Sequence, residues 1–272
     1  MPRAVLCDSV ETAARWVDQN GPAFIKRNHS TGGTGLRAIA RPTDAARAWN
    51  GIGSPQTLLI QNRIAGPVGV TEMVVHRGIA TAWFSSLKVR TNGPLGGSLI
   101  RRMVNPPDMA GLVKKLAAET GFCGLCRFDW VQGSVTGKVS ILEFHPRPPS
   151  GYACGRCAGI DVLVALGALL RDDQTSTQKP LPEASLFDAP VCCYFPERLR
   201  YPLRRNWGDL KYWLPRTNVV SWRNIPFDDP AVLGSIINRE VASIPRYEVR
   251  EMRKLIADGI ERFREKFFRT LH

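Results

Sequence analysis

Two consecutive pairs of strand-like runs in the middle of the chain restrict its fold more than any other feature. Residues 68–89 have strand-like patterning on both sides of a turn at Gly78, which predicts a hairpin. Residues 125–131 and 138–144 form the second pair, with a turn between them. A helix is expected between the two pairs, over residues 107–120. The chain is thus expected to contain both strands and helices.

The region before these hairpins contains a glycine-rich loop between two short strands. A helix is expected to begin with Asp8 as its N-cap, and a strand at residues 23–26 then leads into the loop, residues 29–35. Small residues let backbone N–H groups approach phosphate oxygens, and Lys26 adds a positive charge beside them. The same loop is also a good tight turn, so the loop alone leaves both interpretations open.

Two carboxylates on the second strand pair form a stronger pattern. Asp129 lies on the first strand and Glu143 on the second, where they can converge on one Mg²⁺, which prefers oxygen ligands. Two surface acids on a half-exposed sheet are the alternative. The run Glu-Phe-His-Pro-Arg at residues 143–147 favours the metal site, because it adds a further potential ligand and an arginine at the strand end.

Taken together, these motifs resemble the ATP-grasp family, and they occur in the family's order over about residues 5–172. Each motif matches one family segment: the phosphate-covering loop after Lys26, the adenine-holding hinge at 58–66, the loop of members related to carbamoyl-phosphate synthase at 90–98, the first metal-ligand strand at 124–130, the Glu-x-Asn-Pro-Arg motif at 143–147 and the Gly-Ile-Asp helix start at 159–161.

The resemblance implies two α+β subdomains that grip ATP, followed by a C-terminal helical extension. We expect residues 1–57 to form part of the N-subdomain with the glycine loop. Residues 58–172 would form the C-subdomain with the metal site, and residues 173–272 the extension. The family usually has a preceding domain as well, so we expect a partner chain or a further N-terminal domain to supply that part.

The resemblance also implies an activity and a set of site residues. A cytoplasmic ligase would activate a carboxylate as an acyl phosphate with ATP, and an amine would then displace phosphate; the sequence identifies neither substrate. The implied residues are Lys26, Gly32, Gly33, Gly35, Gln61, Asn62 and Ile64 for ATP, Asp129, Glu143 and His145 for Mg²⁺, and Arg90 and Arg147 for catalysis.

Two site positions depart from the family pattern. Gln61 replaces the usual Glu of the hinge, and His145 replaces the Asn that binds the metal. Imidazole suits softer metals than Mg²⁺, so Mn²⁺ is the alternative ion. A non-catalytic ATP-binding or regulatory module is the alternative function.

The cysteines favour a reducing compartment over secretion. Seven cysteines are an odd number, and the chain is too long to need disulfide staples. The chain has neither a signal-peptide pattern nor an apolar run long enough for a membrane span. Two CxxC pairs, Cys123 with Cys126 and Cys154 with Cys157, could hold a structural Zn²⁺ or could be small buried thiols.

The formal net charge of +13 indicates affinity for anions in general or simply a solvated basic surface. Arginines alternate with aromatic residues over about 198–213, and a long basic helix is expected over roughly the last 24 residues. Such a pattern can bind nucleic acid. We favour packing of the aromatic rings onto the protein core, since no nucleic-acid-binding motif of known geometry is present.

Overall fold

The computed structural model describes residues 1–28, 30, 33–53, 57–91, 97–149, 151–172, 191–193 and 229–242. The chain divides into two compact units, Met1–Cys192 and Cys193–His272. None of the described helices is long and apolar enough to cross a membrane. In the second unit the description covers Cys193 and helix α6 (Pro230–Ala242). The aromatic and arginine segment and the expected basic C-terminal helix lie outside the described residues.

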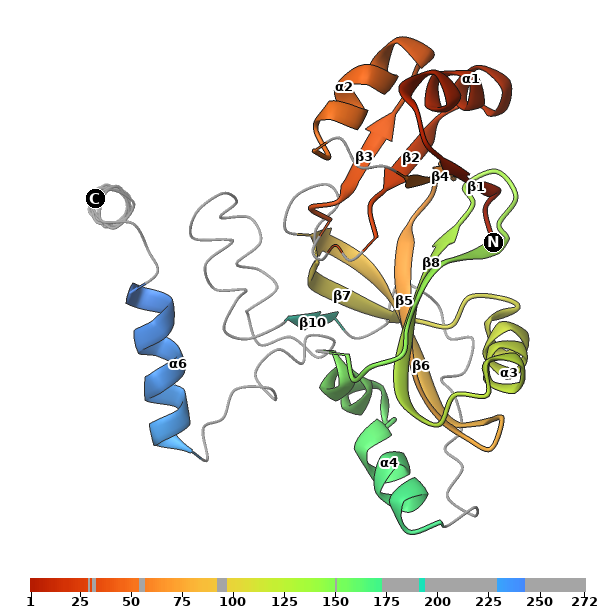
Figure 1. Ribbon diagram of the computed structural model, residues 1–272. Helices are drawn as coiled ribbons and strands as arrows, with labels where there is room; N and C mark the ends of the chain where they lie inside the picture. Colours follow the sequence, from red (N-terminus) through yellow and green to blue (C-terminus); the bar gives the residue numbers. More distant parts are fainter. Residues whose placement is uncertain are drawn as a thin grey trace, which may run out of the picture. The chain divides into compact units, whose positions relative to one another are not determined.

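A four-stranded antiparallel sheet forms the first part of the larger unit. Its strands have the order β1-β4-β2-β3, and helices cover one of its faces (Figure 1). The elements are β1 (Ala4–Cys7), α1 (Val10–Asn20), β2 (Ala23–Lys26), β3 (Leu36–Ile39), η1 (Pro42–Asp44), α2 (Ala45–Asn50) and β4 (Leu58–Asn62). Alternate residues of the strands pack against both helices in one core, which includes Ile25, Ile60 and Trp49.

Helix α1 begins one residue later than the sequence predicts. The N-cap is Ser9, whose side chain accepts a hydrogen bond from the N–H of Thr12, 3.1 Å away. Asp8 instead accepts a hydrogen bond from the Thr12 hydroxyl group. Ser and Asp are comparable N-caps, so their local preference does not decide between neighbouring positions. The prediction of Asp8 as the N-cap was therefore wrong by one residue.

A six-stranded antiparallel sheet forms the second part, with the strand order β10-β7-β6-β5-β8-β9. Helix α3 packs against one of its faces, and α4 contacts strands β5, β6 and β8. The elements are β5 (Val68–His76), β6 (Ile79–Thr91), β7 (Ser98–Val104), α3 (Met109–Thr120), β8 (Gly124–Gln132), β9 (Val139–His145), η2 (Tyr152–Ala158), α4 (Val162–Leu170) and β10 (Val191–Cys193).

The two faces of the six-stranded sheet differ in character. One face joins α3 in an apolar core that includes Met73, Phe128 and Trp130. The residues between these in the β5 and β8 sequences point to the opposite face because side chains alternate along a strand, and there charged residues lie beside apolar ones such as Val70 and Val74. That face carries Glu72, Arg127 and Asp129, and it contains the candidate site.

Strand β4 belongs to the first sheet, where it lies between β1 and β2. The expected subdomain boundary at residues 57 and 58 put this strand in the second part. Strands β1 and β7 were not expected at all.

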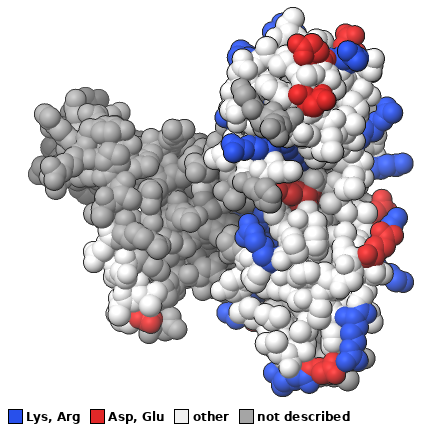
Figure 2. Space-filling model, in the orientation of Figure 1, with Lys and Arg blue, Asp and Glu red and all other residues white. Residues whose placement is uncertain are grey.

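Figure 2 shows Lys and Arg side chains scattered over the face in view, with acidic side chains between them. On that face the basic residues do not form one continuous patch.

Candidate functional site

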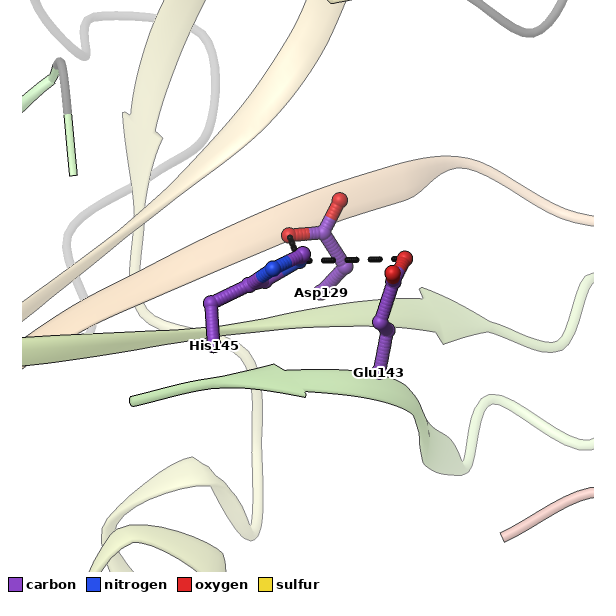
Figure 3. Close-up of side chains that lie close together, drawn as sticks. All are labelled: Asp129, Glu143 and His145. Carbon is purple, nitrogen blue, oxygen red and sulfur yellow. Dashed lines mark ion pairs between the residues drawn. The ribbon is translucent and has the colours of Figure 1, made fainter. Parts of the chain in front are cut away.

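Three potential metal ligands converge on the polar face of the six-stranded sheet. Asp129 lies on β8 and Glu143 and His145 on β9, and one ligand atom from each lies within 4.8 Å of the others. Asp129 pairs with Glu143, and Arg127 pairs with His145, and such opposed residues share a face. His145 Nε2 lies 3.5 Å from Asp129 Oδ1 and 3.7 Å from Glu143 Oε2 (Figure 3).

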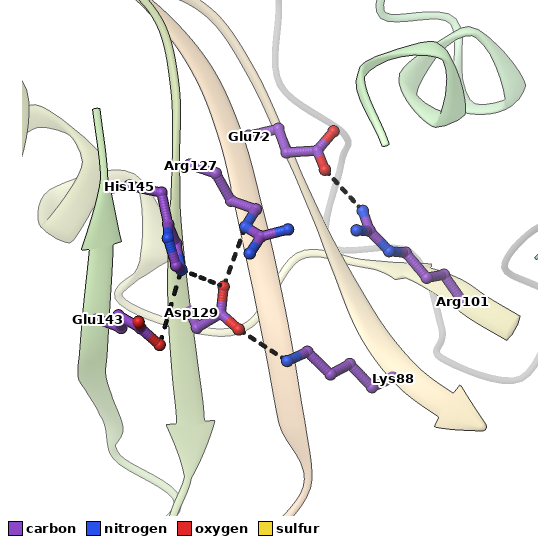
Figure 4. A network of polar contacts seen from close by, with 7 residues as sticks. All are labelled: Glu72, Lys88, Arg101, Arg127, Asp129, Glu143 and His145. Carbon is purple, nitrogen blue, oxygen red and sulfur yellow. Dashed lines mark hydrogen bonds and ion pairs between the residues drawn. The ribbon is translucent and has the colours of Figure 1, made fainter. Parts of the chain in front are cut away.

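Two basic side chains contact the carboxylate of Asp129. Lys88, on β6, donates a hydrogen bond of 2.7 Å to Oδ2, and Arg127 Nε lies 3.1 Å from Oδ1 (Figure 4). Burial by itself raises the pKa of Asp129. The neighbouring His145, Lys88 and Arg127 outweigh burial, so the pKa lies below its ordinary value. Asp129 is therefore held as a carboxylate although only 8% of its surface is exposed.

The cluster fits a divalent metal ion. Asp129 Oδ1 and His145 Nε2 are buried atoms that lack a well-formed hydrogen bond within the part of the chain described, although Arg127 Nε lies 3.1 Å from Oδ1 as an ion pair. Buried polar atoms without partners are costly, and a metal ion would provide one. The side chain of Glu143 is 58% exposed and can turn toward a ligand. The carboxylates suit Mg²⁺, whereas the imidazole adds a donor that favours softer ions such as Mn²⁺ or Zn²⁺.

Lys26 places a positive charge from the first sheet near these carboxylates. Lys26 is the last residue of β2. Its side chain lies on the same face of the first sheet as those of Phe24 and Gln61, which are paired in the register. The helices α1 and α2 pack against the other face. Burial lowers the pKa of Lys26, and the charges of Glu143 and Asp129 act in the opposite direction. The ammonium group thus lies within electrostatic range of both acids, although they belong to the other sheet.

The glycine loop after β2 closes on itself. The N–H of Arg27 donates to the carbonyl of Gly35, 2.8 Å away. Gly33 has a φ of 79°, and a Cβ on Gly35 would lie 2.4 Å from Ser30 Cβ. Both positions therefore favour glycine. Gly32, also predicted to contact ATP, lies outside the described residues.

The segment predicted to hold adenine continues β4 of the first sheet. Gln61 is 5% exposed, and the side chain of Asn62 accepts a hydrogen bond of 2.8 Å from Trp16. The backbone N–H groups of Asn62 and Arg63 donate to carbonyl groups just before β1 and β2. These two N–H groups are therefore already bonded within the first sheet.

The two arginines predicted to be catalytic lie at strand ends. Arg147 follows β9; its N–H donates to the carbonyl of His145, and its side chain is exposed. Arg90 is half-buried near the end of β6, where the pairing with β7 is irregular. It follows Lys88 by two residues. The roles of both arginines remain predictions.

Sequence reasoning missed four charged residues of this face. Arg127 precedes Asp129 by two residues on one strand, so strand alternation could have identified it. Lys88 carries no local signal, because its contact with Asp129 crosses β5. Glu72 and Arg101 form a fully buried ion pair of 2.8 Å, with exposures of 0% and 2% (Figure 4).

The cysteines do not form a zinc site among the described residues. Cys126 packs in the apolar core under α3, and burial raises its pKa to about 12. Cys123 is exposed, and Cys154 is buried in η2. Within the described ranges, the group of candidate metal ligands includes no cysteine. The side chain of Cys157 lies outside the described residues. The hypothesis of a structural zinc site therefore gains no support from the described cysteines.

Comparison with solved structures identifies the fold. The chain is similar to the biotin carboxylase domain of 2-oxoglutarate carboxylase from Hydrogenobacter thermophilus, with 17% identity, a TM-score of 0.51, and coverage of 66% of this chain and 43% of that one. The biotin carboxylase of Campylobacter jejuni gives 15% identity, a TM-score of 0.50 and coverage of 70% and 45%. The chain has the ATP-grasp fold. The predicted fold class is thereby confirmed.

A further similar structure is the ATP-grasp ligase PsnB in complex with a minimal precursor. It shares 13% identity at a TM-score of 0.47, with coverage of 63% of this chain and 55% of that one. The chain therefore spans about half the length of the ATP-grasp structures that it matches. No protein-family model and no curated protein matches it.

Proposed function

We propose that this chain is the ATP- and metal-binding part of an ATP-dependent ligase that activates a carboxylate as an acyl phosphate for attack by an amine. The observation that carries the proposal is the convergence of Asp129, Glu143 and His145, with the charges of both acids acting on Lys26. Phosphoryl transfer depends mainly on positioning and charge stabilisation. An ammonium group opposite a metal-binding carboxylate pair supplies that stabilisation.

Molecules bound to the similar structures support a metal–nucleotide ligand. The Hydrogenobacter biotin carboxylase domain is in complex with MgADP, ADP and bicarbonate, and the Campylobacter enzyme is in a β,γ-ATP complex. The likeness at this identity concerns the fold, so the proposed activity rests on the chemistry of the site. A partner chain or a further domain, which would complete the length of these proteins, is part of the proposal.

The residues of this chain would take distinct roles in a two-step reaction. Lys26 and the glycine loop would hold the phosphates, and the segment from Gln61 to Ile64 would hold adenine. An oxygen of the substrate carboxylate attacks the γ-phosphorus, and ADP leaves. The amine then attacks the acyl carbon, phosphate leaves and the amine nitrogen loses a proton. Arg147 and Arg90 would neutralise the transferred phosphoryl group.

Asp129, Glu143 and His145 would hold the divalent metal, Mg²⁺ or Mn²⁺, in this scheme. A bound metal would neutralise negative charge on the triphosphate. Lys88 and Arg127 keep Asp129 ionised, which a metal ligand requires.

A non-catalytic ATP-binding module is the second candidate. The contacts of Asp129 with Lys88 and Arg127 favour it, because the carboxylate is already neutralised by the protein. This candidate predicts nucleotide binding without turnover, even when a partner chain is supplied.

The ligase proposal is tested by nucleotide turnover with a broad panel of carboxylates and amines. We expect release of ADP and phosphate that depends on both substrates and on Mg²⁺ or Mn²⁺. Glu143→Ala should lower turnover and the affinity for metal–ATP by about tenfold or more. Absence of turnover together with an unchanged affinity of Glu143→Ala would sink the proposal. Tight binding without turnover would favour the second candidate.

A further inference from the structure

Both oxygen atoms of the Asp129 carboxylate lie against a basic side chain. Lys88 Nζ is 2.7 Å from Oδ2, and Arg127 Nε is 3.1 Å from Oδ1. Mg²⁺ binds oxygen at about 2.1 Å, so a metal on either oxygen would lie within about 5 Å of a cationic nitrogen. Even at the dielectric constant of water, a divalent ion and a cation at that separation change an affinity by about tenfold.

The charges around the site add to this repulsion. Lys26, Lys88 and Arg127 are cationic, whereas Asp129 and Glu143 are anionic, which leaves one excess positive charge before any metal binds. A divalent ion alone would increase that excess. A metal bound to a triphosphate carries net negative charge instead, and the same basic residues then attract it.

Lys88 is better suited than Arg127 to exchange partners. Its flexible side chain reaches Asp129 from β6 across β5, and its ammonium group is a compact point charge that suits phosphate oxygens. Arg127 lies on the same strand as Asp129 and stands opposite Glu72 and His145 in the register, so charged or polar neighbours flank it on both sides.

We propose that Lys88 excludes a free divalent metal from Asp129, so that metal and nucleotide load together. This inference rests on the proposed ATP and metal binding. The triphosphate takes up the ammonium group of Lys88, and the carboxylate of Asp129 becomes available to the metal that arrives with it. Lys88 is thus a positioning residue that sets the order of binding.

The test measures Mn²⁺ binding by electron paramagnetic resonance, with Mn²⁺ alone and with a non-hydrolysable ATP analogue. Wild type should bind Mn²⁺ weakly alone and at least about tenfold more tightly with the analogue. Lys88→Met should bind Mn²⁺ alone about tenfold more tightly than wild type. Lys88→Arg, which keeps the charge, should bind Mn²⁺ alone as weakly as wild type. Lys115→Met removes an exposed charge from α3 and should change neither affinity.

The outcomes separate this inference from the proposed function. Equal binding of Mn²⁺ alone by wild type and Lys88→Met, with the analogue still promoting binding, would overturn the role of Lys88 only. If Lys115→Met increased the affinity for Mn²⁺ alone as much as Lys88→Met does, the effect would come from overall charge. That result would also overturn the role of Lys88. Failure of wild type to bind Mn²⁺ with the analogue would overturn the proposed function itself. Thermal melts of each variant verify folding.

Discussion

Single residues of the candidate site combine hard and soft donors for one metal ion. Asp129 and Glu143 offer oxygen atoms, and His145 offers a buried nitrogen without a hydrogen-bond partner among the described residues. Mg²⁺ demands oxygen ligands, whereas Mn²⁺ accepts imidazole more readily. In the proposed site, the choice of ion would therefore depend on one side chain at the end of β9.

We predict that His145→Asn shifts the metal preference toward Mg²⁺. Wild type should bind a non-hydrolysable ATP analogue more tightly with Mn²⁺ than with Mg²⁺, because the imidazole contributes to the bond with Mn²⁺. The amide oxygen of Asn should reduce that preference by about tenfold. Titration calorimetry with each metal gives the two affinities. An identical ratio in both proteins would show that His145 is not a ligand.

The sequence predicted the pairing of two residues of the candidate site because strand alternation is local. Asp129 and Glu143 could be put on paired strands from the turn between them, and the register does pair them. Lys88 could not be found in this way. Its contact depends on the order of β6, β5 and β8, which is decided by the packing of whole strands rather than by neighbouring residues.

The elements differ in how strongly their own residues specify them. The β5–β6 hairpin is marked by Arg77 and Gly78, both of which have positive φ angles. Strand β7 follows a glycine-rich segment and carries adjacent arginines, so its sequence has no clear alternation. Its partner β6 provides the pairing. Strand β1 is short, and it depends in the same way on pairing with β4. Sequence patterns predict elements with local signals and miss those that a neighbouring strand stabilises.

We predict that Gly69→Ala destabilises the six-stranded sheet by about 1–3 kcal/mol, as overpacking usually does. A Cβ at Gly69 would lie 2.2 Å from the ring of Trp130, a fully buried side chain that cannot move freely. Gly111 is the matched control, since a Cβ there meets nothing within 4 Å. Gly111→Ala, within α3, should stabilise by about 0.5–1 kcal/mol. Urea denaturation measures both changes.

Equal changes in the two glycine variants would contradict this account of the sheet. A loss in Gly111→Ala would mean that α3 has neighbours outside the described contacts. A neutral Gly69→Ala would mean that β5 and β8 can shift apart near Asp129. In that case, the contact between Lys88 and Asp129, which crosses β5, would also be adjustable.

On the scale of the whole molecule, the site depends on two sheets that are stabilised by separate cores. One core joins the four-stranded sheet to α1 and α2, and the other joins the six-stranded sheet to α3. Lys26 belongs to the first sheet and the acids to the second. The family order of the motifs implies two subdomains that grip ATP, and that division stays a prediction. The motif order did not predict that β4 completes the first sheet, because hydrogen bonding between distant strands has no local signature.

Lys26 should therefore show opposite effects on binding and on stability. Burial lowers its pKa, which means that the charged ammonium group destabilises the folded chain below that pKa. Lys26→Met should therefore retain or raise the melting temperature near pH 7. Its affinity for metal–ATP should fall by about tenfold or more, because the variant loses a charge-assisted contact with phosphate. The stability gain should shrink as pH rises toward about 10.4, where the unfolded lysine also loses its charge. Calorimetry and analogue titration across pH measure both quantities, with exposed Lys138→Met as the control. A Lys26→Met protein that is less stable but binds normally would make Lys26 a structural residue and would separate the two sheets in function.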